Sequence, residues 1–233
     1  MVKRIKIIFI LPTLVSFLGA VDIHKKAEIS YVKTSGNTNT SSLYGKLGAN
    51  IKNEIREIKL NGSILKSEDN HKKSANKYEV ELNYNRMLTQ SVYTYMGAYY
   101  EKDEFSDYSS RFNIGPGLGY KAINTDEEAL EVQAGLYYAL DKFDNGRRDD
   151  YAAPSMELSY RYKIRENVEF KQVLKYLVSA EEVSRYFITS DSAIAVKMME
   201  NLSLGVSYRI DYVNQTEKEK TDKKFMTSLI FDF

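Results

Sequence analysis

Apolar and polar residues alternate one by one along most of the chain. In the clearest run, 202–212, leucine, valine, isoleucine and tyrosine occupy the even positions, and small or charged residues occupy the odd ones. Runs at 155–164, 130–140 and 78–84 repeat this pattern. A period of two is the period of a β-strand, whose side chains point alternately to its two faces. The pattern therefore predicts an all-β protein.

The alternating segments predict twelve strands, most of them about 12 to 16 residues long, against about 5 or 6 in globular sheets. We place them at 27–35, 41–52, 54–67, 74–88, 91–104, 107–122, 127–141, 149–164, 167–181, 184–198, 200–214 and 220–233. Short connections, such as 88–90 and 124–126, alternate with longer polar ones, such as 67–74 and 142–148. An even number of long strands with short turns on one side is typical of an outer-membrane barrel.

The fold class we predict is a transmembrane antiparallel up-and-down β-barrel. In lipid every backbone N–H and C=O needs a partner within the protein, so an all-strand membrane protein must close into a ring. A soluble sandwich or a lipocalin-like barrel also alternates, because one face is buried and the other is solvated. The length of the strands argues against that alternative, whereas charges in mid-strand do not separate the two.

The first twenty residues have the pattern of a secretory signal peptide. Lys3, Arg4 and Lys6 precede an apolar run from Ile7 to Leu18, and small residues follow it at 19–20. A single membrane anchor would need a longer apolar run. We therefore predict two regions, a signal peptide at 1–20 and an outer-membrane barrel at 21–233.

The composition excludes several functions and draws attention to tyrosine. The 233 residues include 33 basic and 32 acidic side chains, 19 tyrosines, and no cysteine or tryptophan. Near-zero charge gives no basic face for nucleic acid, and without cysteine there is no disulfide, thiolate zinc site or cysteine nucleophile. Tyrosine suits the membrane boundary, so the excess predicts aromatic girdles, although Tyr137 falls on the expected inner face.

One segment, Gly115-Pro116-Gly117-Leu118-Gly119, interrupts a predicted strand. Its spacing matches neither the dinucleotide-binding nor the P-loop fingerprint. We expect all three glycines to face the lumen and make room for long side chains opposite. Because proline removes a ladder hydrogen bond, we also expect a bulge or bend at Pro116.

Mixed charges fall on the inner face of the predicted strands. They are Glu131, Glu157, Arg161, Lys163, Glu169, Lys171, Lys175, Arg209 and Asp211. They could line a polar channel for small solutes or ions, or they could pair and hold the lumen shut. Twelve strands lie between filled eight-stranded barrels and open channels of 16 to 18 strands. We favour a narrow or plugged lumen.

No catalytic or metal-binding constellation is visible. His24 precedes the first predicted strand and His71 lies in a polar loop, so neither adjoins a serine on one strand face. Four acidic residues and an asparagine cluster near the 142–148 connection, at Asp141, Asp144, Asn145, Asp149 and Asp150, without the spacing of a calcium loop. We predict no enzyme activity, cofactor or metal.

The last strand carries an alternating aromatic and aliphatic pattern at Phe225, Leu229, Phe231 and Phe233. This ending resembles the signal by which the assembly machinery recognises outer-membrane barrels. We therefore expect a monomer in the bacterial outer membrane with both termini in the periplasm. Its expected partners are outer-membrane lipid and, during biogenesis, that machinery and periplasmic chaperones; we expect no nucleic acid.

Short motifs add a family resemblance that spans nearly the whole mature chain. They are Thr34-Ser35-Gly36-Asn37-Thr38, the stretch from 100–105 through 117–120 to 124–126, and the tail at 220–223. Together they resemble the salt-induced outer membrane protein family, a YdiY-like domain of unknown function. Glu104 departs from it, since the family implies a basic residue there. The resemblance implies an outer-membrane barrel with a link to salt or osmotic stress, and no catalytic residues.

The function expected from these observations is non-enzymatic. The barrel would be a narrow pore, or it would maintain envelope integrity under salt or osmotic stress. Two alternatives remain open: a lipid-modifying or lipid-hydrolysing outer-membrane enzyme, and a barrel that binds partners through its surface loops.

Overall fold

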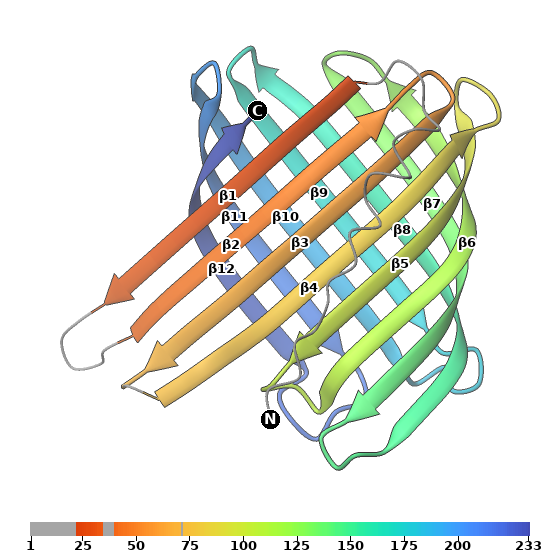
Figure 1. Cartoon of the computed structure of the whole chain (residues 1–233), viewed down its shortest axis with the longest axis vertical. Helices are drawn as coiled ribbons and strands as arrows, with labels where there is room; N and C mark the ends of the chain where they lie inside the picture. The colour runs from red at the N-terminus through yellow and green to blue at the C-terminus, as the bar shows by residue number, and fades with distance from the viewer. Residues whose placement is uncertain (1–21, 35–39, 71) are drawn as a thin grey trace, which may run out of the picture.

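The chain forms a closed barrel of twelve antiparallel strands (Figure 1). The structure, a computed structural model, describes residues 22–34, 40–70 and 72–233. The strands are β1 Asp22–Thr34, β2 Thr40–Lys52, β3 Arg56–Asp69, β4 Lys72–Met87, β5 Val92–Asp103, β6 Tyr108–Asn124, β7 Glu128–Phe143, β8 Arg148–Arg165, β9 Val168–Val178, β10 Tyr186–Met199, β11 Leu202–Val213 and β12 Thr221–Asp232. The predicted fold class is confirmed. The predicted signal peptide lies outside the described residues.

Each strand pairs with its neighbours in sequence, and β12 returns to pair with β1. The connections 53–55, 88–91, 125–127, 166–167 and 200–201 lie at one end of the barrel, together with Asp22 and Phe233; we call this the turn end. The other connections lie at the loop end. The described residues contain no helix long and apolar enough to cross a membrane.

Strand alternation separates an apolar outer face from a polar inner face. Large apolar side chains such as Leu47, Leu118 and Met156 are 57–68% exposed on the outside. Most tyrosines also point outward, and three of them, on β9, β10 and β11, form a chain near the loop end. The ring centroids of Tyr176 and Tyr186 are 5.9 Å apart, and those of Tyr186 and Tyr212 are 5.8 Å apart. Tyr137 points inward, as expected, and lines the lumen.

Several predicted boundaries were wrong. Strand β1 begins at Asp22, so His24 lies within it, opposite Asn50 of β2. The run His24-Lys25-Lys26 concealed this strand, because its charges lie at the rim of the barrel. The connection between β3 and β4 is also shorter than expected, since β3 ends at Asp69 and β4 begins at Lys72.

The glycines of β6 make room for aromatic rings. A Cβ atom on Gly119 would lie 2.0 Å from Cζ of Tyr93, and one on Gly117 would lie 2.3 Å from Cζ of Tyr95. These two tyrosines are 1% and 5% exposed. At Gly115 the close neighbour is backbone, because its Cβ would lie 2.1 Å from the carbonyl oxygen of Leu136. The expectation that inward glycines accommodate long side chains is confirmed at Gly117 and Gly119.

Pro116 does not produce the expected bulge. Between β6 and β7, Ile114 pairs with Tyr138 and Gly117 with Gly135, so the register is the same on both sides of the proline. The register shifts of this ladder lie near its ends instead, at 108–110 and 121–123. Because glycines flank Pro116, the two backbones can stay close although proline donates no hydrogen bond.

The crowding at Gly119 gives a test of the fold. Gly119→Ala should lower the free energy of unfolding by about 1–3 kcal/mol, because the packed ring of Tyr93 must move. The matched change Gly62→Ala should have little effect, since the nearest atom to its Cβ would be 3.9 Å away. Urea titration, followed by the mobility shift of the folded barrel on unheated gels, measures both. Equal losses in the two variants would contradict this packing.

Candidate channel lumen

The structure places all nine charges predicted for the lumen on the inner face of β7, β8, β9 and β11. Glu157 is opposite Lys175 in the β8–β9 register, and Arg161 is opposite Lys171. Lys163 is exposed near the turn end, and Glu131 accepts a hydrogen bond from the hydroxyl of Tyr93. Their role in lining a pore stays a prediction.

One ion pair joins facing walls of the barrel. Arg209 of β11 donates to both carboxylate oxygens of Glu79 of β4, at 2.8 Å and 3.2 Å. In the ring, β12, β1, β2 and β3 separate these two strands. The bond therefore spans the lumen rather than following its wall, and its bidentate geometry fixes both side chains.

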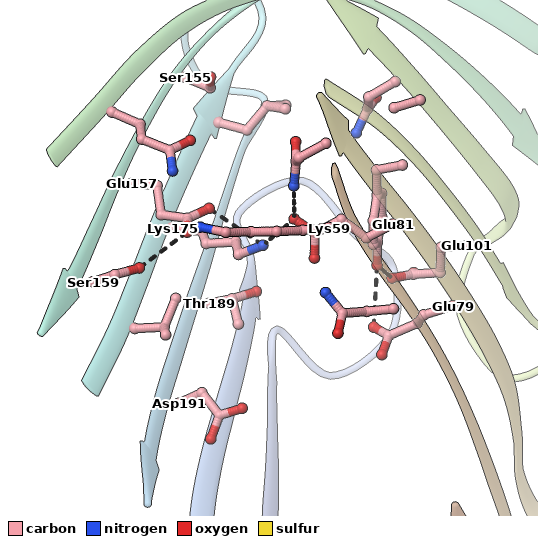
Figure 2. Close-up of a pocket in the computed structure, with 18 of the residues that line it drawn as sticks. Lys59, Glu79, Glu81, Glu101, Ser155, Glu157, Ser159, Lys175, Thr189 and Asp191 are labelled. Carbon is pink, nitrogen blue, oxygen red and sulfur yellow. Dashed lines mark hydrogen bonds and ion pairs between the residues drawn. The ribbon is translucent and has the colours of Figure 1, made fainter. Parts of the chain in front are cut away.

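A second ion pair spans the lumen from the same strand. The Nζ of Lys175 on β9 lies 2.9 Å from Glu81 of β4 and 3.3 Å from Glu157 of the adjacent β8. Strands β5 to β8 separate β9 from β4. Figure 2 shows Lys175, Glu157 and Ser159 on one wall facing Glu81 on the other. Two successive inward positions of β4 are thus tied to β11 and β9, the two neighbours of β10 on the facing wall.

Further groups surround the Glu79–Arg209 pair. Lys77 lies 3.3 Å from Glu79 and 3.0 Å from Glu101, and the hydroxyl of Tyr99 donates to both carboxylates. On the far side, Arg209 also contacts Asp211 at 3.0 Å. Removing one partner of such a buried pair typically costs about 3–5 kcal/mol, because the other charge stays desolvated. Substitution of any one member of this network should therefore destabilise the barrel.

A packed layer fills the lumen near the loop end. Asp141, which is 0% exposed, accepts hydrogen bonds from Arg111 at 3.1 Å and from the hydroxyl of Tyr151 at 2.9 Å. The guanidinium of Arg111 lies 3.6 Å from the ring centroid of Phe187 and 4.6 Å from that of Tyr108. Cation–π contacts of this kind are stronger when they are desolvated. Since Phe187 belongs to β10 and Arg111 to β6, this layer also bridges separate walls.

Three loops meet above this layer. The carboxylate of Asp107, between β5 and β6, accepts hydrogen bonds from the hydroxyl of Thr216 and from the backbone N–H of Glu217 at 2.7 Å. Lys218 of the same β11–β12 loop lies 3.1 Å from Asp144, between β7 and β8. We call these contacts the loop clamp. It joins three connections over the loop end.

Between the loop-end layer and the turn end lies a cavity of about 460 Å³. Many of its lining groups are uncharged amides and hydroxyls, including those of Tyr44, Asn61, Asn83, Asn113, Gln133 and Tyr137. The Oδ1 atom of Asn113 is buried there and has no hydrogen-bond partner among the described residues. A cavity of this size holds a small molecule, and its lining favours a polar one.

Sequence reasoning missed the residues that close the lumen. Glu79 and Glu81 were recognised only as the polar positions of an alternating strand. Asp141 was considered as a cation ligand, whereas the structure pairs it with Arg111. Within the described part of the chain, no cluster of three or more His, Cys, Asp or Glu side chains could hold a metal ion. His24 is exposed at the turn end, and His71 lies outside the described residues.

The apolar outer wall and the polar, charged lumen define a channel-like β-barrel of the outer-membrane type. The chain belongs to the family described as "Protein of unknown function, DUF481", whose match covers residues 27–233. The Escherichia coli (strain K12) protein YdiY, described as uncharacterized, is 23% identical over 202 residues, which cover 85% of this chain and 79% of YdiY. The resemblance inferred from the sequence motifs is thereby confirmed, whereas the link to salt stress stays a prediction.

Solved structures are similar in fold. The COG4313 outer membrane channel from Pseudomonas putida F1 matches with a TM-score of 0.55 and 9% identity, over 93% of this chain and 96% of that channel. The NanC porin matches with a TM-score of 0.50 and 11% identity, over 91% of this chain and 98% of the porin. At these identities the likeness shows the fold alone.

The loop clamp should depend on pH. Although burial raises the pKa of Asp107, the hydrogen bonds from Thr216, Glu217 and Lys218 lower it overall, below its ordinary value. A lowered pKa in the folded state means that the clamp is fully present above the ordinary aspartate pKa of about 3.9 and is lost as the pH falls through the folded value. Acid should therefore release the β11–β12 loop.

A spin label on Glu219→Cys measures this release, since the chain has no cysteine of its own. The label should become mobile only as the pH falls below the ordinary aspartate pKa of about 3.9, and Asp107→Ala, which removes both acceptor oxygens, should make it mobile at pH 7. Asp126→Ala, in an exposed turn at the opposite end, serves as the matched control and should change nothing. A label that stays immobile at pH 7 in Asp107→Ala would rule out the clamp.

Proposed function

We propose that the protein is a narrow outer-membrane channel for small polar solutes or ions, held shut at rest by ion pairs across its lumen. Glu79 and Glu81 of β4 reach Arg209 of β11 and Lys175 of β9 on the facing wall, and this arrangement is the main support for the proposal. The polar cavity beside these pairs supports it. A lumen that served only to stabilise the barrel would be packed like the loop-end layer.

The ion pairs suit a gate because each basic group can leave its partner across the lumen and keep a second partner on its own side. Lys175 is already shared between Glu81 and Glu157, so it can leave the cross-lumen contact and stay paired along its own wall. The cost of opening is then far below that of exposing an unpaired buried charge. Arg209 has the same choice between Glu79 and Asp211.

The proposal includes the bacterial outer membrane as location, a monomer in contact with outer-membrane lipid, and termini in the periplasm. It also retains the assembly-signal role of Phe225, Leu229, Phe231 and Phe233. It assigns no catalysis. Neither the sequence nor the described structure supplies a paired nucleophile and base that would favour the lipid-hydrolysing alternative. A part in envelope integrity under salt or osmotic stress is compatible with such a channel and requires separate tests.

Conductance in planar bilayers tests the gate. The purified wild type should show low or brief conductance, and Glu81→Ala/Lys175→Ala should show a steady conductance several-fold higher, because both members of one of the two cross-lumen pairs are gone. The matched control is Glu57→Ala/Lys59→Ala. It removes the same two side-chain types from a 3.4 Å pair that lies along a single strand, so conductance should stay close to that of the wild type.

Two results would contradict the proposal. Large, steady conductance of the wild type would mean that the ion pairs do not close the lumen. Equal, low conductance of both double variants would mean that the loop-end layer alone blocks passage. The heat-dependent gel shift of each variant should confirm, before recording, that the barrel has folded.

A further inference from the structure

The seam that closes the barrel is short. Strands β1 and β12 share four register pairs, from Lys26–Asp232 to Ile29–Leu229, and Lys25 and Phe233 add two backbone hydrogen bonds at the turn end. By contrast, β1 and β2 share thirteen pairs and β11 and β12 share eleven. Figure 1 shows β1 and β12 diverging towards the loop end.

Both strands continue beyond the last pair. Strand β1 runs on to Thr34 and remains paired with β2, while β12 begins at Thr221 and is paired with β11. Beyond Ile29 and Leu229, residues 30–34 and 224–228 would lie opposite one another in this register, and among these described residues no pair forms across the seam. Free N–H and C=O groups are costly in hydrocarbon, so a tapered notch lined by them needs polar groups or water within it.

The surroundings of this notch change from apolar to charged. Tyr31 and Phe225 lie on its outer lips and are 62% and 68% exposed. On the inner face of β12, Lys224 and Met226 line a small pocket together with Tyr44, Lys77, Glu79 and Arg209. Lys224 also lies 3.0 Å from Asp211, which pairs with Arg209. The seam strand β12 therefore presents apolar side chains to lipid and, on its inner face, borders the ion-pair network.

We propose that the β1–β12 notch is a lateral portal for a single-chain amphiphile. The acyl chain lies between the lips formed by Tyr31 and Phe225 and against Met226. The polar head and its water satisfy the free backbone groups of the notch and reach Lys224 and Arg209. This portal is a second route into the lumen, through the wall, and it does not require ion conduction along the axis.

Fluorescence quenching tests whether a chain enters. Bimane is attached to a single cysteine at Met226→Cys, behind the notch, and the probe is a brominated single-chain phosphocholine added to vesicles of unbrominated lipid. Met226→Cys should be quenched nearly as strongly as Leu229→Cys on the lipid face. Ala193→Cys, on the inner face behind the complete β9–β10 and β10–β11 ladders, should be quenched several-fold less. Equal, weak quenching at positions 226 and 193 would overturn the proposal.

A disulfide staple tests whether the notch is the route. Tyr31→Cys/Thr227→Cys would close the notch, and the matched staple Ala27→Cys/Phe231→Cys joins residues that are already paired. A fluorescent single-chain fatty acid should bind to the reduced notch variant and lose binding on oxidation, whereas the matched staple should not affect binding. Unchanged binding after oxidation would overturn the portal. So would a staple that dissociates dimers without affecting the probe, because the notch would then be an edge for a second copy.

Discussion

The requirement that a strand in hydrocarbon be hydrogen-bonded along both edges determines the rest of this structure. Twelve strands meet it by closing into a ring, and the number of strands then sets the width of the lumen. At this width a single arginine and glutamate, Arg209 and Glu79, can meet across the interior. A polar lumen of such a size closes through side-chain pairs, without an inserted loop or helix from the described residues.

The same requirement explains a composition that looks like that of a soluble protein. The 33 basic and 32 acidic residues nearly balance, because inward charges are desolvated and must be paired. Lys77 with Glu101 and Arg111 with Asp141 show that balance locally. Charge that would be spread over the surface of a soluble domain is here divided between the lumen and the connections at the two ends, and apolar side chains cover the outside of the wall.

Alternation along the chain was sufficient to predict a barrel and its twelve strands, although not every strand boundary. It could not predict partners across the lumen, because those depend on the stagger of the closed ring. Glu79 and Arg209 are 130 residues apart, and nothing local to either indicates the other. Asp141 shows the same limit, since the sequence indicated only a candidate cation ligand, whereas the side chain is 0% exposed and pairs with Arg111. His24 was misplaced because a strand end at the rim can be polar on both faces.

Side-chain packing is denser on the wall around β6 than on the opposite wall around the β1–β12 seam. Strand β6 holds Tyr93 and Tyr95 against its glycines and lies diametrically opposite β12 in the strand order. One wall is therefore densely packed, whereas the wall facing it contains the short seam with four register pairs. If the barrel widens, the strain should concentrate where the fewest hydrogen bonds must break. The β1–β12 seam is that place, so a widening of the barrel should open the notch.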